Sequence, residues 1–443
     1  MALPGGRLTR AALALLVCGI SACGDSSGGS SSELIVEPQD ETRTVGVNVA
    51  YGAVALTPLG SGDFLLVRTE TEDDNPTDED TGQQSIVTER FDADLASIGE
   101  GSVDAGPSPH FLSWVSACSS NGKIAASWTD FTPHKQLPFG ITLDTQNVEA
   151  VRLDDDSNPL GSFTVNENLI GEQRQSHIAC LSDGSLAITW TSQCIAVNRL
   201  GDISFALFTP EECNTEPVNG AYLQRFDANG DPEGPMQLVA GANQSDWSSS
   251  EPAIASLPHG RVLVVTGNLA RVYDENGTTN DETAIPSGSY APLLSCSHDR
   301  CTILTSGLSG PITATVVDPD DLSDAVEIEV KAPVVEIDEP EHTVTVEPQR
   351  PNLACDAAGT CLITWRLARE SWFTDYGNTE ELGIYAVAID ARSGRLGFEQ
   401  LLVAAPLIGF NESTTVTTAV SDGKFVTARN TDGVVILDRV DVR

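Results

Sequence analysis

Residues 184–190 read Gly-Ser-Leu-Ala-Ile-Thr-Trp, and residues 224–230 read Gln-Arg-Phe-Asp-Ala-Asn-Gly. The first stretch is a glycine turn that leads into a short apolar strand, and the second is a strand that ends in an Asp-Asn-Gly turn. Glycine supplies positive φ, and aspartate and asparagine bond their own turns, so both stretches are typical of antiparallel hairpins.

The same two stretches recur along the 443 residues of the chain. Copies of the first stretch begin at residues 62, 122, 184, 260, 301, 360 and 423. Each is followed by a strand that ends in an aspartate, namely Asp92, Asp144, Asp227, Asp274, Asp318, Asp390 and Asp438. A mean period of about 58 residues indicates a repeat architecture, in which each unit packs against its neighbours.

Each unit has room for about four short antiparallel strands and shows no convincing helix. This pattern predicts an all-β fold, a β-propeller of seven four-stranded blades, with six or eight blades as alternatives. The last unit has room for only three strands before Arg443. We therefore expect a strand at residues 33–37 to pair with the last blade and close the ring, which would hide both sheet edges.

Four insertions separate the second and third strands of their units. They span residues 70–84, 130–138, 192–219 and 368–381. Equivalent loops of a propeller emerge on one face, so the insertions are expected to build a single elaborated surface. Long loops on a rigid ring are where binding residues are commonly found.

The N-terminus predicts export and anchoring. Residues 1–22 have the charged, apolar and small-residue segments of a signal peptide. Residues 20–23, Ile-Ser-Ala-Cys, resemble the bacterial lipobox, which implies lipidation of Cys23. The rest of 23–32 is a Gly/Ser-rich tether, so the propeller domain is expected at 33–443. The alternative is a secreted protein in which Cys23 has no role.

Residues 225–234 read Arg-Phe-Asp-Ala-Asn-Gly-Asp-Pro-Glu-Gly. This stretch resembles the RFDxxGxxxG-type repeats of uncharacterised bacterial lipoproteins with β-propellers, a resemblance that spans residues 45–443. Its motif is a turn signature, so it implies a fold and an envelope location but carries no catalytic residue.

Ten cysteines fit an oxidising compartment. Cys18 lies in the signal and Cys23 is the lipidation site. Disulfides are predicted across two hairpin turns and across one long loop, at Cys296–Cys301, Cys355–Cys361 and Cys194–Cys213. Cys118 and Cys180 then remain, and only elimination pairs them.

The chain carries 64 acidic and 24 basic residues, a formal charge of −40. That charge excludes binding to nucleic acid or to an anionic membrane through the surface. The acidic run at 70–80 and the turn at 227–233 could hold calcium, but a solvated loop and an Asp turn explain them better. No metal site, cofactor or catalytic residue is therefore assigned.

One loop concentrates the residue types that dominate binding hot spots, namely Arg366, Arg369, Trp372, Phe373 and Tyr376. The alternative is that Trp372 and Phe373 plug a local core. We expect a monomer, lipid-anchored in the bacterial cell envelope at the outer membrane, that binds an envelope protein or a glycan. The alternative function is a glycan-active hydrolase or lyase with carboxylates near the central channel.

Overall fold

The structure is a computed structural model, and part of the chain is described in it. The described residues are 34–45, 49–60, 62–71, 84–104, 112–136, 142–166, 172–193, 196–198, 203–204, 220–241, 251–286, 288, 291–297, 299–306, 312–330, 335–338, 343–346, 348–371, 378–408, 415–431 and 434–443. Residues 34–443 form one compact unit.

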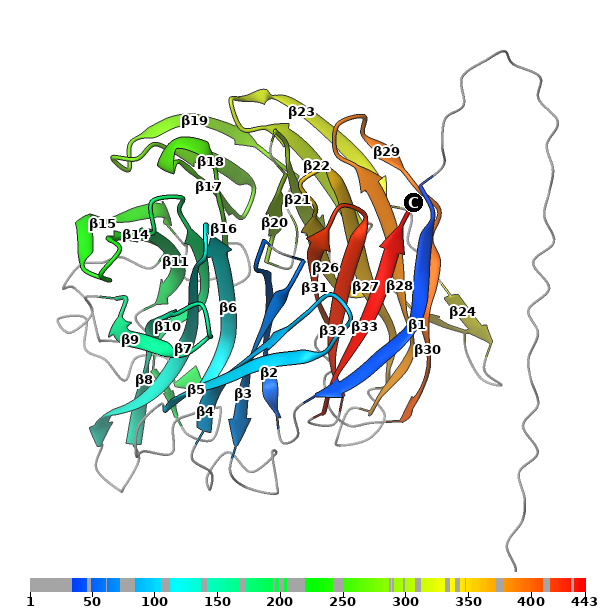
Figure 1. The fold of residues 1–443 in the computed structure, drawn as a ribbon, viewed down its shortest axis with the longest axis horizontal. Coiled ribbons are helices and arrows are strands. Elements are labelled where there is room, and N and C mark those ends of the chain that lie inside the picture. The colour runs from blue at the N-terminus through cyan, green and yellow to red at the C-terminus, as the bar shows by residue number, and fades with distance from the viewer. Residues whose placement is uncertain are drawn as a thin grey trace, which may run out of the picture. The chain divides into compact units, whose positions relative to one another are not determined.

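Within the described residues, the chain folds into seven four-stranded antiparallel blades that follow one another around a ring (Figure 1). Blade 1 comprises β2 (Val49–Pro58), β3 (Phe64–Thr71), β4 (Gln84–Phe91) and β5 (Ser97–Asp104). Blade 2 comprises β6 (Leu112–Ser120), β7 (Lys123–Gln136), β8 (Thr142–Leu153) and β9 (Pro159–Thr164). Blade 3 comprises β10 (Glu172–Cys180), β11 (Leu186–Gln193), β14 (Gly220–Phe226) and β15 (Pro232–Gly241).

The second half of the ring repeats this order. Blade 4 comprises β16 (Pro252–Ser256), β17 (Val262–Thr266), β18 (Leu269–Tyr273) and β19 (Thr279–Ala284). Blade 5 comprises β20 (Leu293–Cys296), β21 (Cys301–Ser306), β22 (Ile312–Asp318) and β23 (Asp321–Val330). Blade 6 comprises β26 (Pro348–Cys355), β27 (Thr360–Ser371) and β28 (Asn378–Asp390), with β29 (Arg395–Leu396) and β30 (Gln400–Ile408) both paired to β28.

Blade 7 is built from both ends of the described chain. It joins β31 (Thr415–Ser421), β32 (Lys424–Thr431) and β33 (Val434–Val442) to β1 (Val36–Val45), which lies beside β33 in Figure 1. Val36 lies opposite Val442, and the backbones of Ile35 and Arg443 exchange hydrogen bonds of 2.8 and 2.9 Å. The predicted fold, blade number and N-terminal closing strand are thus confirmed.

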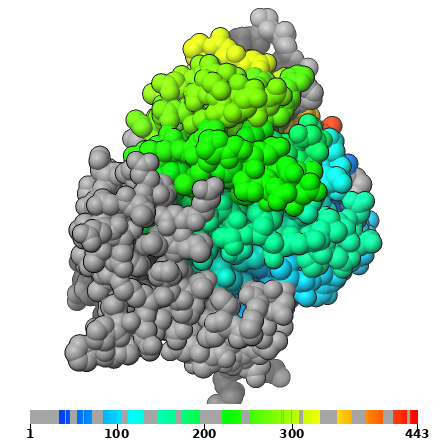
Figure 2. Space-filling model, turned by 90° about the vertical axis from the view of Figure 1, so that its left-hand side faces the viewer, coloured from blue at the N-terminus to red at the C-terminus, as the bar shows by residue number. Residues whose placement is uncertain are grey.

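The core consists of apolar clusters between blades. Across the described residues there are seven such clusters, and each draws its side chains from two neighbouring blades. Phe64 of blade 1 packs with Val426 of blade 7 in the cluster at the closure, where β1 also contributes Val45. Successive blades are stacked as layers in chain order in Figure 2. One apolar seam for each junction is what a closed seven-blade ring requires.

The turn chemistry seen in the sequence forms hairpins between the third and fourth strands. The Oδ1 atom of Asp227 accepts the backbone N–H groups of Asn229 at 2.7 Å and Asp231 at 2.9 Å, which lowers the pKa of this carboxyl. Gly230 occupies the left-handed position with φ of 89°. The carboxylate of Asp227, in the turn considered above for calcium, is therefore bonded to the backbone of its own turn.

Two of the predicted turn aspartates are misplaced. In blade 2 the turn residue is Asp154, which accepts the N–H groups of Asp156 and Asn158, whereas Asp144 lies inside β8. The turn of blade 2 lacks the Asp-x-x-Gly pattern, because Ser157, with φ of 69°, stands where blades 3 and 4 have Gly230 and Gly277. Asp438 lies inside β33, because the fourth strand of blade 7 comes from the N-terminus and no turn is needed.

Disulfides join three cysteine pairs among the described residues. Cys296–Cys301 and Cys355–Cys361 each link facing residues of the first and second strands of one blade, as the spacing predicts. The third bond, Cys118–Cys180, joins the first strands of blades 2 and 3. Cys194 and Cys213 lie outside the described residues, so their pairing stays a prediction.

Two smaller hairpins and one helical turn complete the described elements. β12 (Ala196–Asn198) and β13 (Ile203–Ser204) extend the sheet at β8, and β24 (Val335–Asp338) pairs with β25 (Thr343–Val346). Pro258–Gly260 forms a single 3₁₀ turn. No helix in the described part of the chain has the length and apolarity to traverse a bilayer.

Candidate functional site

The ring has two chemically different faces. Because the strands of a blade alternate in direction, second-to-third connections and blade-to-blade connections leave on one face, called here the insertion face. The hairpins between first and second strands and between third and fourth strands leave on the opposite face, called here the turn face. The four predicted insertions lie where the second strand passes to the third, on the insertion face. Two of them are strand over several residues, because residues 130–136 continue β7 and residues 368–371 continue β27.

The first strands of three blades are irregular near the insertion face. In β6, β10 and β26 two residues stand opposite one residue of the second strand, which defines a β-bulge. In each case the single residue is a buried tryptophan, namely Trp128, Trp190 and Trp365. The tryptophan that ends the repeated sequence stretch thus marks the position of an inner-strand bulge.

Two of these bulges hold a side chain in an unfavourable backbone conformation. Trp114 in β6 has φ of 48°, and Gln175 in β10 has φ of 57°. Left-handed backbone is uncommon for residues other than glycine and costs about 1–2 kcal/mol for each residue. Such strain persists where the surrounding structure imposes it, and it is concentrated at functional sites.

The strained residues share a cluster with two charged side chains, called here the Trp114 site (Trp114, Arg174, Gln175 and Glu251). The guanidinium carbon of Arg174 lies 6.0 Å from the centroid of the Trp114 ring. The amide of Gln175 donates to the carboxylate of Glu251, which directly precedes β16. The site therefore spans the first strands of blades 2, 3 and 4, at the end of each strand nearest the insertion face.

The carboxyl of Glu251 has an altered acidity at this site. Burial raises the pKa of Glu251, and the Arg174 guanidinium and the Gln175 amide oppose that rise. Two residues further along β10, burial lowers the pKa of His177 to about 4, so this imidazole is neutral at physiological pH.

The exposure of Trp114 sets it apart from the structural tryptophans. Its side chain is 38% exposed, whereas Trp128 is 3% exposed and Trp190 is fully buried. An exposed indole beside a guanidinium is the residue combination found at binding hot spots. The site offers an aromatic surface, a cation and a carboxyl, which suits contact with a polypeptide.

The turn face has a cavity of about 1250 Å³ near the ring axis. It is lined mainly by the turns between first and second strands of blades 1, 2, 6 and 7. The buried acid of this lining is Asp356, and its two oxygens accept the backbone N–H groups of Thr360 at 2.8 Å and Gly423 at 2.7 Å. That carboxylate is held by the fold, so the cavity gives no support to a hydrolase or lyase that uses it.

The binding residues predicted from the sequence are distributed differently. Arg366 lies within β27, opposite Gln349 and Ile384, and is 4% exposed, so it is not a surface group. Arg369 lies further along β27. Trp372, Phe373 and Tyr376 lie outside the described residues, and so does Cys23.

Sequence reasoning missed the Trp114 site entirely. Its residues come from three blades and share no motif, and a bulge leaves no mark in a single strand. The available signal was the position of Trp114 and Gln175 in first strands whose partner strands contain Trp128 and Trp190.

No protein-family model matches the chain, and no curated protein is significantly similar to it. Solved structures with similar folds share little sequence. A protein of unknown function from Dyadobacter fermentans DSM 18053 has 12% identity and a TM-score of 0.45, covering 91% of this chain and 100% of that one.

Two further structures are similar to the same extent. BamB from Moraxella catarrhalis has 11% identity and a TM-score of 0.40, covering 91% of this chain and 96% of its own. The β-propeller domain of Cps50 (Swd1) from Myceliophteria thermophila has 10% identity and a TM-score of 0.43, covering 89% and 98%. The inferences below therefore rest on the residues of this chain.

Proposed function

We propose that this chain is a lipid-anchored β-propeller of the bacterial cell envelope that binds a protein partner at its insertion face, around the Trp114 site. The observation that carries the proposal is the exposed indole of Trp114, which is held in strained backbone within reach of Arg174. Trp128, which stands opposite the bulge, already fills the core. The exposed indole of Trp114 therefore makes no contribution to core packing that would explain it.

Features outside the site support the envelope location. The lipobox-like Ile-Ser-Ala-Cys at residues 20–23 supports anchoring through Cys23, and the Gly/Ser-rich residues that follow would act as a tether. The three disulfides of the described residues suit an oxidising compartment. We place the protein at the outer membrane.

Photo-crosslinking in cells tests the partner and its place together. A photoreactive phenylalanine, which keeps an aromatic ring at the position, replaces Trp114 in one strain and Leu160 in another. Leu160 is the control because it is exposed at 59% and belongs to the same blade, but lies on the outer strand β9. We expect an adduct from position 114 and none from position 160. Equal adducts from both positions, or none from position 114, would contradict the proposal.

A second variant and a labelling experiment complete the test. Arg174→Ala is expected to weaken the adduct at position 114, because the guanidinium supports one face of the ring. Metabolic labelling with an alkyne-tagged fatty acid is expected to mark the native chain and not Cys23→Ser. An unlabelled native chain would remove the lipid anchor from the proposal and leave the binding site standing.

A further inference from the structure

The turn-face cavity is bordered by a disulfide that the proposed function does not use. Cys355 ends β26, is partly exposed and lies in the cavity wall. Its bonded partner, Cys361, stands directly opposite in β27 and is fully buried. Cys355 therefore borders both the cavity and the rim of the apolar seam between blades 5 and 6, where its Sγ lies 3.7 Å from the carbonyl oxygen of Ser295, whereas Cys361 lies within that seam.

We propose that Cys355–Cys361 is a thiol-exchange site that reacts with a dithiol carried by a basic polypeptide segment. A partner thiolate attacks Cys355 Sγ, a new S–S bond joins the partner to Cys355, and the electron pair of the broken bond leaves on Cys361 Sγ. The partner's second thiolate then attacks the mixed disulfide. The partner departs oxidised to a disulfide, and Cys355 and Cys361 remain as thiols after taking up its two electrons and two protons.

The position of Thr302 favours this direction of attack. Its Oγ1 atom lies 3.3 Å from Cys361 Sγ in a buried setting between blades 5 and 6. A hydroxyl can donate a hydrogen bond to the thiolate that forms as Cys361 leaves, and a stabilised leaving thiolate speeds exchange. Cys355 is the half-buried cysteine of the pair and the one that lines the cavity, so we assign the attack to its sulfur.

The bond contributes less to the stability of the ring than Cys118–Cys180 does. Its cysteines are six residues apart in sequence, so it closes a small loop and removes little entropy from the unfolded chain. Cys118–Cys180 closes a loop of 62 residues, and its cysteines are 9% and 2% exposed. The fold thus has one disulfide suited to linking blades and another suited to reacting.

Charge around the cavity selects the reacting thiol. The wall contains the carboxylates of Asp155, Asp356 and Asp422, and its arginine, Arg90, bonds to Asp63 at 2.6 Å. A concave site lined by one sign of charge attracts the opposite sign and repels its own. A thiol on a cationic segment is therefore favoured over an anionic one.

Small thiols of different charge test the site in the native full-length protein. Cysteamine, 2-mercaptoethanol and thioglycolate are applied at equal thiolate concentration, and alkylation with peptide mapping follows each disulfide. We expect Cys355–Cys361 to open at least about tenfold faster than Cys118–Cys180, and cysteamine to outpace thioglycolate about tenfold at low salt. High salt should reduce the differences in opening rate between the three reagents.

Cys296–Cys301 serves as the matched control, because it spans the same kind of hairpin and is not part of the cavity wall. Opening of Cys355–Cys361 no faster than this control, or a rate that ignores reagent charge, would overturn the proposal.

Thr302→Val tests the leaving group separately. It should slow opening of Cys355–Cys361 several-fold, while Thr305→Val, a buried threonine on the same strand, should not. The opening rate of Cys118–Cys180 in each variant is the control, because it rises if the substitution destabilises the whole fold. Slowing by both variants, or by neither, would contradict the role of Thr302.

Discussion

Blades 1 to 3 and blades 4 to 6 use one repeat position in opposite ways. Two residues before the turn aspartate, the first group has Arg90, Arg152 and Arg225, and the second has Val272, Val316 and Ala388. The three apolar residues are buried in the seams between neighbouring blades. The three arginines instead reach across to the hairpins of the next blade.

The three arginines donate hydrogen bonds to backbone carbonyl oxygens of the next blade. Arg90 Nη1 donates to the carbonyl of Asp155 at 2.7 Å, and Arg152 donates likewise to Ala228. Arg225 donates to the carbonyl of Asp274 at 3.2 Å and to that of Gly260 at 2.8 Å. The arginine of the Arg-Phe-Asp motif is thus an interblade link, which explains why it accompanies a turn signature.

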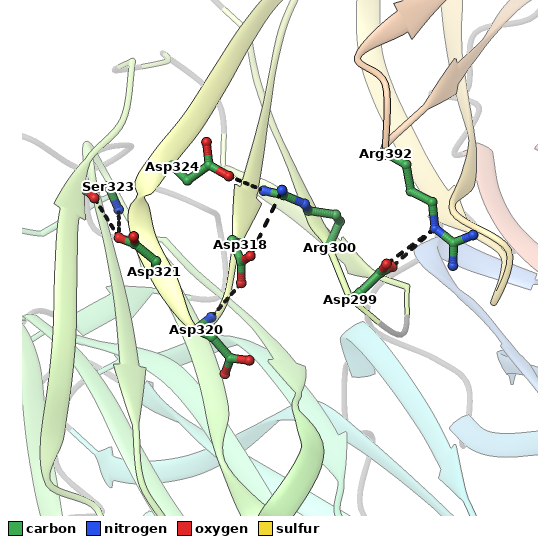
Figure 3. A network of polar contacts seen from close by, with 8 residues as sticks. All are labelled: Asp299, Arg300, Asp318, Asp320, Asp321, Ser323, Asp324 and Arg392. Atoms are coloured by element: carbon green, nitrogen blue, oxygen red, sulfur yellow. Dashed lines mark hydrogen bonds and ion pairs between the residues drawn. The ribbon is translucent and has the colours of Figure 1, made fainter.

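The arginine side chains at the junctions beyond blade 4 form exposed ion pairs, beside backbone amides that donate to side chains of the neighbouring blade, such as that of Gly423 to Asp356 at 2.7 Å. Arg261 of blade 4 lies 2.7 Å from Asp320 of blade 5, whose side chain is 75% exposed. Figure 3 shows Asp299 of blade 5 and Arg392 of blade 6, which meet at 3.3 Å with both side chains about half exposed. Exposed pairs contribute about 0–1 kcal/mol each, so the apolar seams and the amide hydrogen bonds, and not the arginines, hold this arc. We infer that blades 1 to 4 form the more rigid arc, and they carry the Trp114 site.

The largest effect should come from the disulfide that crosses blades. Replacing Cys118 and Cys180 together by alanine should cost about 4 kcal/mol of unfolding free energy, because the bond closes a loop of 62 residues. The same change at Cys296 and Cys301 should cost about 2 kcal/mol. Urea unfolding of both double variants measures these losses. Equal losses would show that Cys118–Cys180 does not stabilise the ring more than a bond within one hairpin does.

The next effect separates a buried arginine from an exposed one. Arg225→Leu should cost about 2–3 kcal/mol, because Arg225 is 7% exposed and two carbonyls lose their donor. Arg392→Ala should change stability by less than about 0.5 kcal/mol. The same urea series compares them, and a loss at Arg392 as large as that at Arg225 would show that both arcs depend on side-chain links.

Acid and base should act on the contributions of His177 and Glu399 to stability in opposite directions. The folded pKa of His177 in blade 3 is about 4, below its ordinary 6.5, so the unfolded chain takes up the proton first and stability falls as pH drops from 6.5 to 4. In blade 6, burial raises the pKa of Glu399 from 4.5 to about 7, so stability falls as pH rises between those values.

Two substitutions resolve these opposed contributions. His177→Gln should remove the loss of stability in acid, and Glu399→Gln should remove the loss toward neutral pH. Urea midpoints from pH 4 to 7 are the measurement. Curves that stay parallel to that of the native protein would show that these groups do not titrate as their burial implies.

The smallest effect concerns backbone strain at Trp114. Trp114→Gly should be about 1 kcal/mol more stable than Trp114→Ala, because glycine accepts φ of 48° without a Cβ penalty. Both variants should lose the partner. Thermal unfolding compares them, and alanine as stable as glycine would indicate that the backbone relaxes once the indole is removed.

The fold was largely predictable because each blade carries its own turn chemistry. Glycines such as Gly184 and aspartates such as Asp227 mark hairpin ends locally, without reference to distant residues. The error at Asp144 arose where this marking is absent, since Ser157 takes the left-handed position in blade 2. Ring closure could be deduced because a propeller cannot leave a three-stranded blade open.

The site and the interblade bonds were not predictable in the same way. Cys118 and Cys180 meet because their strands face each other across two blades, which spacing along one chain does not reveal. Trp114, Arg174 and Glu251 likewise come from three blades and meet only near the ring axis. Arg366 shows the converse, since a residue type suited to binding is buried inside a strand.

Hydrogen exchange at two first-strand amides that bond to the preceding blade tests the rigid-arc account most directly. The amide of Ile178 donates to Ser116 Oγ across blades 2 and 3 at 3.3 Å, and the amide of Cys355 donates to Ser295 Oγ across blades 5 and 6 at 2.9 Å. In the native protein, the account predicts that Ile178 exchanges at least about tenfold more slowly than Cys355, despite its longer hydrogen bond. Equal exchange, or faster exchange at Ile178, would contradict a rigid arc beneath the Trp114 site.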